Sequence, residues 1–92
     1  MVRVEVTKHL WDHLPALRDR ELLVEASTVA EVVRELERIA PGFSFYVCDE
    51  RGCLRPHVNI FVEQERIRDR TRLSDPVSSG TRVLIMQALS GG

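Results

Sequence analysis

One segment of this chain has the periodicity of an amphipathic helix, and it lies among segments that alternate with the period of a β-strand. In residues 29–40, apolar side chains recur every three or four positions and charged side chains occupy the opposite side. Thr28, with Glu31 three residues later, fits the capping box, in which both side chains satisfy backbone donors near a helix start. Pro41 and Gly42 end the pattern, because proline cannot continue the hydrogen-bond ladder. The sequence therefore predicts one main helix.

Short runs with strand character stand on both sides of this helix. In each of them, apolar residues either alternate with polar ones or form a brief block, and we expect strands at residues 2–7, 21–26, 57–63, 65–69 and 81–89. Residues 8–20 are polar and contain a proline, so we expect a long loop there with at most one helical turn. Phe43, Phe45, Tyr46 and Val47 are expected to form a short irregular segment.

The resulting order, with two strands, one helix and three further strands, predicts an α+β fold of two layers. One main helix packs on one face of a mixed sheet, and the first and last strands form its central pair. The expected core face of the sheet consists of Val2, Val4, Val6, Val58, Ile60, Val62, Val83 and Ile85. A chain of 92 residues has room for one small domain, which we assign to residues 1–89, with a flexible Ser-Gly-Gly tail at 90–92.

Composition narrows the classes of partner. Thirteen basic against fourteen acidic residues give a net charge of −1, so no surplus of positive charge favours nucleic acid as the main partner. No apolar run approaches the roughly 20 residues that a membrane span needs. The N-terminus alternates apolar and charged residues, unlike a signal peptide, and we expect a cytoplasmic protein.

No common enzyme motif is present in the sequence. The five glycines form no phosphate-binding loop, so nucleotide binding of that kind is not expected. His9 and His13 are four residues apart but lack a third zinc ligand nearby, and we interpret them as surface histidines. The spacing of Cys48 and Cys53 matches neither a redox dithiol nor a zinc knuckle, and favours a structural or incidental role. We expect no bound cofactor and no metal.

The last three residues, Ser90, Gly91 and Gly92, are the most informative for chemistry. Two glycines place no side chain beside the final carboxylate, so such a tail can extend into a narrow slot. A carboxylate becomes a good acyl donor only after another enzyme has given its oxygen a good leaving group. The alternative is an ordinary frayed end or an added terminal sequence without function.

The whole-chain pattern resembles the ubiquitin-like sulfur carriers, which have the β-grasp fold. The resemblance rests on the strand order, the VNIFV strand at 58–62, the segment SDPVSSGTRV at 74–83 and the ending ALSGG at 88–92. Members of this family include the small subunit of molybdopterin synthase, the sulfur carrier of the thiamine pathway and the carrier of an actinobacterial cysteine pathway.

The resemblance implies a protein co-substrate without a catalytic site of its own. In the family, an enzyme of the ubiquitin-activating type uses ATP to adenylate the terminal glycine, which becomes a thiocarboxylate and donates sulfur to a biosynthetic enzyme. Here, Gly92 is then expected to carry the adenylate and the thiocarboxylate, and Gly91 to supply the slender approach. The acceptor pathway, whether molybdenum cofactor, thiamine, cysteine or tRNA thiolation, stays open.

Strand alternation predicts where partners bind. If Val83 and Ile85 face the helix, then Leu84, Met86 and Phe61 point to the opposite face of the sheet. The predicted partner-binding residues, next to the tail, are Phe61, Arg82, Leu84, Met86, Ala88, Leu89 and Ser90, with Arg3, Arg66 and Arg68 as further members of a polar rim. The alternative is that residues 8–20 or a second subunit cover this face.

Two other functions stay open at this stage. A ubiquitin-like modifier would use the same adenylated Gly92 to form an isopeptide bond with lysines on target proteins. The presence of a single lysine, Lys8, mildly favours the carrier over a modifier that builds chains on itself. A non-catalytic binding module would use only the sheet face and would not need Gly91 and Gly92.

Overall fold

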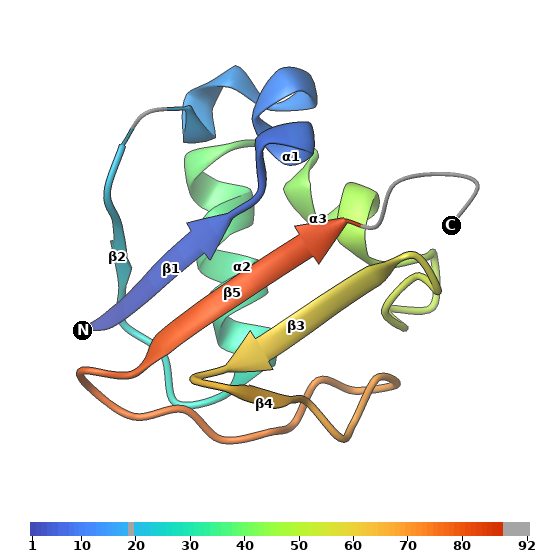
Figure 1. The fold of residues 1–92 in the computed structure, drawn as a ribbon. Coiled ribbons are helices and arrows are strands. Elements are labelled where there is room, and N and C mark those ends of the chain that lie inside the picture. Colours follow the sequence, from blue (N-terminus) through green and yellow to red (C-terminus); the bar gives the residue numbers. More distant parts are fainter. Residues whose placement is uncertain (19, 88–92) are drawn as a thin grey trace.

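A computed structural model describes residues 1–18 and 20–87 of the chain. Its elements, in chain order, are β1 (Val2–Val6), α1 (Lys8–His13), the 3-10 helix η1 (Pro15–Leu17), β2 (Leu22–Val24), α2 (Val29–Ile39), α3 (Phe43–Val47), β3 (Val58–Val62), β4 (Glu65–Arg66) and β5 (Arg82–Gln87) (Figure 1). The expected tail at 90–92, and the expected end of the last strand at 88 and 89, lie outside the described residues.

The five strands form one mixed sheet with the order β2-β1-β5-β3-β4. β5 runs parallel to β1, whereas the β1–β2, β3–β5 and β3–β4 pairs are antiparallel. The first and last strands are therefore central neighbours, as the sequence predicts (Figure 1). β4 contains only two residues, so the predicted edge strand is present but shorter than expected. This topology, with α2 across the sheet, is the β-grasp arrangement.

The α2 helix begins at the predicted cap. Thr28 Oγ1 accepts a hydrogen bond from Glu31 N at 3.2 Å, and the Glu31 carboxylate accepts bonds from Ser27 N at 2.6 Å and Ser27 Oγ at 2.9 Å. These bonds from Ser27 are the main reason that the pKa of Glu31 is lowered. The local pattern thus fixes where the helix starts, since both side chains satisfy donors at its first turn.

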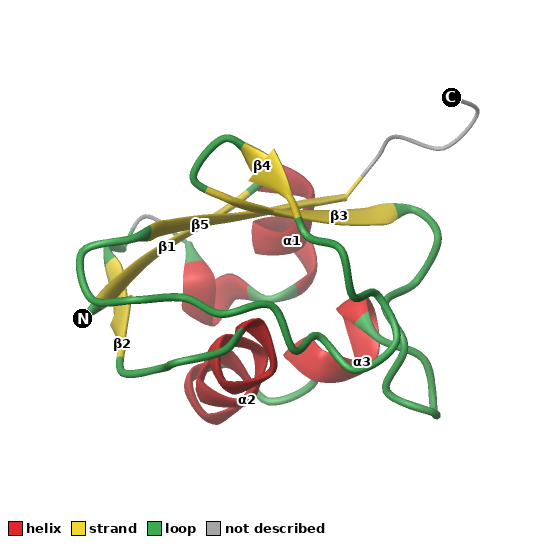
Figure 2. Cartoon of the chain, turned by 90° about the horizontal axis from the view of Figure 1, so that it is seen from below, coloured by secondary structure: helices red, strands yellow, loops and turns green. Residues whose placement is uncertain are grey.

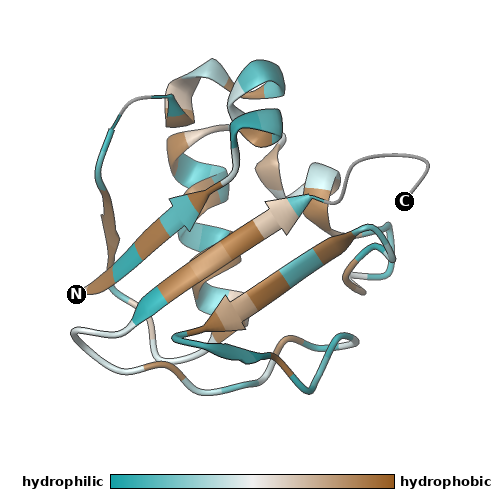
Figure 3. Cartoon of the chain, in the orientation of Figure 1, coloured by the Kyte–Doolittle hydropathy of each residue, from teal (hydrophilic) through white to brown (hydrophobic). Residues whose placement is uncertain are grey.

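The core lies between the sheet and its helices. α2 and α3 pack on the same side of the sheet (Figure 2). Seven of the eight residues expected on the core face are buried, and the eighth, Val62, is only partly buried because the sheet ends nearby in the short strand β4. Ribbon colouring by hydropathy shows the alternation along β1 (Figure 3).

Two expected loops are helical, which corrects the sequence prediction. Residues 8–17 form α1 and η1 rather than a loop with one turn, and residues 43–47 form α3 rather than an irregular segment. These helices have six residues or fewer, too short for a repeating pattern or for stability in isolation. The burial of Leu10, Leu17 and Phe43 in the core stabilises them instead.

The junction between α2 and α3 is held by one carboxylate. Gly42 has a φ of 102°, a left-handed conformation that glycine adopts without strain, and it turns the chain from one helix into the next. Glu37 accepts hydrogen bonds from Gly42 N at 2.9 Å, Ser44 N at 2.9 Å and Ser44 Oγ at 2.8 Å. These donors hold the pKa of Glu37 below its usual range. The junction therefore orients α3 at the end of the sheet where β5 finishes (Figure 1).

Candidate functional site

The outer face of the sheet carries the predicted apolar patch. Phe61 on β3 pairs with Leu84 on β5, and Met86 pairs with Asn59, so the three apolar residues are neighbours across two strands. Met86 is 36% exposed, and Phe61 and Leu84 are half-buried. We define these three residues, Phe61, Leu84 and Met86, as the outer patch.

The segment at 8–17 does not remove this patch from solvent. Leu10, Leu14 and Leu17 are buried in the same cluster as the apolar face of α2, which is the core on the helix side. The alternative that residues 8–20 cover the outer face is therefore not supported by the burial of either set of residues. An exposed apolar patch on a small domain is typical of a protein-binding surface.

Of the arginines predicted to surround the outer patch, Arg66 is the one that an observed contact places against it. The guanidinium of Arg66 lies 5.9 Å from the ring centroid of Phe61, and the Arg82 guanidinium lies 3.8 Å from the Glu5 carboxylate. Arg3, which pairs with Arg82 across the central strands, lies 3.7 Å from the Glu21 carboxylate. Both ion pairs are solvent-exposed and contribute little to stability, so these arginines stay available for a partner. Arg68 is exposed just beyond β4.

β5 ends at Gln87, the last residue that the structure describes. The five predicted site residues at 88–92 follow it in the sequence. Gln87 N donates to Thr7 Oγ1 at 3.3 Å, which joins the end of β5 to the residue after β1. The Gln87 Oε1 atom is buried and accepts no hydrogen bond within the described part of the chain. The predicted residues Ala88, Leu89, Ser90, Gly91 and Gly92 lie outside the described residues.

A hollow of about 500 Å³ lies beside Gln87 and was missed by sequence reasoning. We call it the exit hollow, and it is lined by Phe45, Tyr46, Arg55, His57 and Gln87. Its residues come from α3, from the segment before β3 and from the end of β5, so no local pattern links them. The sequence held one signal for this hollow, the aromatic residue Phe45. The other large apolar residues of its segment, Phe43, Tyr46 and Val47, pack in or against the core, whereas Phe45 is exposed.

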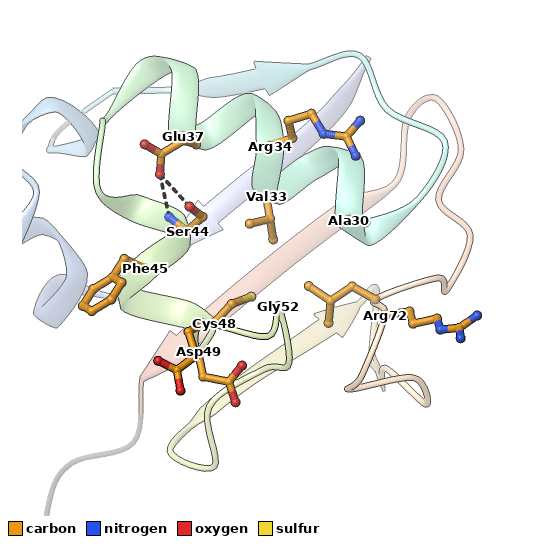
Figure 4. A pocket seen from close by; sticks show the side chains of 12 residues that line it. Ala30, Val33, Arg34, Glu37, Ser44, Phe45, Cys48, Asp49, Gly52 and Arg72 are labelled. Atoms are coloured by element: carbon orange, nitrogen blue, oxygen red, sulfur yellow. Dashed lines mark hydrogen bonds between the residues drawn. The ribbon is translucent and has the colours of Figure 1, made fainter.

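A second groove, of about 430 Å³, lies between α2, α3 and the turn after α3 (Figure 4). Its wall includes the Glu37–Ser44 hydrogen bond and the Cys48 side chain (Figure 4). Burial and the nearby Asp49 raise the pKa of the Cys48 thiol, which stays protonated and unreactive at neutral pH. Cys48 and Cys53 are both free, and the structural or incidental role expected for them stays a prediction.

The described residues hold no cluster suited to a metal ion. No group of three or more histidine, cysteine, aspartate or glutamate side chains comes together in residues 1–18 and 20–87. His13 stacks on Tyr46 with ring centroids 5.1 Å apart, so α1 packs it against α3. Within the same ranges, no helix has the length and apolar character needed to cross a bilayer.

These features define a ubiquitin-like β-grasp domain. Its apolar outer patch lies on β3 and on β5, the strand that precedes the last residues of the chain. The chain belongs to the ThiS family, whose model matches residues 9–92. It is thus a ubiquitin-like carrier or modifier, and the family's small carrier proteins are not catalytic themselves.

Solved structures share the fold of this chain. A chain of the Amycolatopsis orientalis BexX/CysO complex is 24% identical, with a TM-score of 0.85 and complete coverage of both chains. Mycobacterium tuberculosis CysO, described as an antigen, is 26% identical, with a TM-score of 0.82 over 97% of this chain and 100% of that one.

An archaeal protein has the same fold. SAMP1 from Haloferax volcanii is 20% identical, with a TM-score of 0.76 over 99% of this chain and 98% of that one. The search of curated proteins returned no match to this chain.

Proposed function

We propose that this chain is a sulfur carrier whose Gly92 carboxylate is activated by an adenylating enzyme of the ubiquitin-activating type. A carboxylate oxygen of Gly92 attacks the α-phosphorus of ATP, the bond to the β-phosphate oxygen breaks, and pyrophosphate leaves. A hydrosulfide-type nucleophile then attacks the acyl carbon, and AMP leaves with the electron pair of the broken bond. The resulting thiocarboxylate donates its sulfur to an enzyme of cofactor or amino-acid biosynthesis.

One observation carries this proposal: the family match extends through the two final glycines to residue 92. Adenylation needs the terminal carboxylate to enter an enzyme pocket, and residues without a Cβ allow the backbone to approach closely there. The outer patch of Phe61, Leu84 and Met86 supports the proposal from the domain side, because it lies on the strands next to the exit of the tail. The partners we propose are therefore the adenylating enzyme and a sulfur-accepting enzyme.

The test is the intact mass of the full chain after incubation with ATP, the cognate adenylating enzyme and a sulfur donor. Replacement of one carboxylate oxygen by sulfur adds about 16 Da, and fragmentation should localise the gain to Gly92. Deletion of Gly92 should abolish the mass gain. The far-ultraviolet circular dichroism and the unfolding midpoint of the shortened chain should match those of the intact chain. A truncated chain that still delivers sulfur would contradict the carrier function.

A ubiquitin-like protein modifier is the second candidate. It is favoured by the fold similarity to small archaeal modifier protein 1 of Haloferax volcanii and Methanosarcina acetivorans. In this case the same acyl adenylate ends in an isopeptide bond between Gly92 and a lysine amine. The mass experiment separates the two, since conjugates to other proteins appear in place of the small mass gain. With an active adenylating enzyme, no change at all would favour a plain binding module.

A further inference from the structure

The exit hollow lies on the helix side of the end of β5. Val83 and Ile85 point into the core, so alternation along the strand directs Gln87 to that same side. Gln87 lines the hollow together with Phe45 and Arg55. Met86, the preceding residue, belongs to the outer patch on the opposite side. A protein that approaches the end of β5 therefore meets the outer patch on one side and the exit hollow on the other.

The reach of the tail limits where such a protein binds. Five residues follow Gln87, and a fully extended chain of that length spans at most about 18 Å. An enzyme that encloses Gly92 must therefore come within this distance of Gln87. The surfaces nearest the exit, including the hollow, lie within that limit.

Phe45 is exposed to an extent unusual for a phenylalanine. It is 70% exposed, whereas Phe43, two residues earlier on α3, is completely buried. The ring is nevertheless held in place, because the Arg55 guanidinium lies 5.0 Å from its centroid and Arg55 Nε donates to the Phe45 carbonyl oxygen at 3.0 Å. Phe45 and Arg55 thus form a preformed unit of an apolar ring and a cation.

The charge of this unit is positive. Arg55 and His57 line the hollow, and none of its described lining residues is acidic. Arg55 forms no ion pair within the described residues. Its charge acts on the Asp49 carboxylate, which already accepts hydrogen bonds from Arg51 N at 2.9 Å and Cys53 N at 3.1 Å. Aromatic residues and arginine are enriched at protein interfaces and among their strongest contacts. The complementary surface is a carboxylate beside an apolar side chain.

We infer that Phe45 and Arg55 are a second anchor for the adenylating enzyme, which contacts them with an acidic residue and an apolar neighbour. This inference rests on the proposed function. Adenylation brings the Gly92 carboxylate against the negatively charged triphosphate, and contacts with the domain hold the carrier on the enzyme equally before and during that step. The two terminal glycines offer no side chains for this purpose, so the enzyme has to draw on the domain.

The test measures pyrophosphate release by the adenylating enzyme at increasing concentrations of the full-length carrier. Phe45→Ala and Arg55→Glu should each raise the KM for the carrier about tenfold or more, the effect of losing about 1.4 kcal/mol of binding. Because both variants leave the tail intact, kcat should stay within about twofold of the wild-type value. Arg55→Glu should also reverse the salt dependence of KM, since an attraction that salt weakens is replaced by a repulsion that salt screens.

Leu23→Ala is the matched control. Leu23 is 46% exposed on β2 and lies opposite Arg3 near the start of β5, at the end of the sheet away from Gln87. Its KM should equal that of the wild type. The unfolding midpoint of each variant shows whether a change in KM arises from lost folding. If Arg55→Glu unfolds, Arg55→Gln, which removes the positive charge without adding a negative one, is tested in its place and should also raise KM.

Three outcomes would overturn the inference and are distinguishable from one another. If the wild-type carrier is adenylated and both variants keep its KM, the anchor is absent and the proposed function stands. If the variants are adenylated normally but deliver sulfur poorly, the surface belongs to the sulfur-accepting enzyme instead. If the wild-type carrier is not adenylated by its competent cognate enzyme, the proposed function and the inference fail together.

Discussion

The two faces of the central strand β5 have similar chemistry and opposite roles. Val83 and Ile85 point to the helices and are completely buried, whereas Leu84 and Met86, equally apolar, stay accessible on the other face. The difference arises from what lies against each face, since α2 covers one and the described residues leave the outer patch accessible. Apolar residues on a strand therefore serve stability or recognition according to their side of the sheet.

The largest expected effect is on the core face. Ile85→Ala should lower the free energy of unfolding by about 2–5 kcal/mol, because it leaves a cavity between two strands and the helix. Urea unfolding followed by circular dichroism measures this change. Ile85→Val, which removes only one methylene, should cost about 0.5–1.5 kcal/mol. If the two variants were equally stable, Ile85 would not be packed as the structure has it.

The covering helix should respond to its cap. Thr28→Ala removes the side-chain acceptor for Glu31 N and should cost about 1 kcal/mol in unfolding free energy. Thr28→Ser keeps an acceptor and serves as the control. Both are measured in the same urea series, and an equal loss in the two variants would mean that the methyl group of Thr28, rather than the cap, stabilises α2.

Acid should affect the connections between elements rather than either face. Hydrogen bonds from Ser74 Oγ, and then from the backbone of Arg72, Ser74 and Thr71, lower the pKa of Asp69 from 3.8 to about 2. The contribution of the Asp69 carboxylate to the free energy of unfolding is fully present above pH 3.8 and is lost as the pH falls toward 2. It is lost because, as the pH falls, the unfolded chain binds the proton before the folded chain does. Asp69→Asn should therefore make unfolding free energy fall less steeply across this range. If the unfolding free energies of the wild type and of Asp69→Asn fell in parallel with pH, this role of Asp69 would be contradicted.

A smaller effect on stability than at Ile85 is expected on the outer face. Leu84→Ala should lower the free energy of unfolding by about 1 kcal/mol, because Leu84 is only half-buried. The same variant should weaken binding to the adenylating enzyme, which isothermal titration calorimetry measures. A loss of stability comparable with that of Ile85→Ala would end the distinction between the two faces.

The strands and the main helix were predictable because their patterns are local. The alternation of Val2, Val4 and Val6 and the cap at Thr28 each act within a few residues, and both appear in the structure as predicted. The short helices α1 and α3 were not predictable, since a few residues cannot display a helical period and depend on burial of Leu10 and Phe43.

The candidate site divides in the same way. The outer patch followed from alternation, whereas the exit hollow joins residues more than forty positions apart in the chain. Phe45 and Phe43 have the same side chain and nearly the same position, and only the packing of α3 decides that one is buried and the other exposed.

The sequence by itself determined the period of each long element, the start of α2 and the alternation that separates the two faces of β5, because these depend on neighbours along the chain. The tertiary structure alone decided that α3 and the segment before β3 meet the end of β5, and so place Phe45 and Arg55 beside the exit of the tail. That meeting depends on long-range packing and on the turn at Gly42, and no local pattern encodes it.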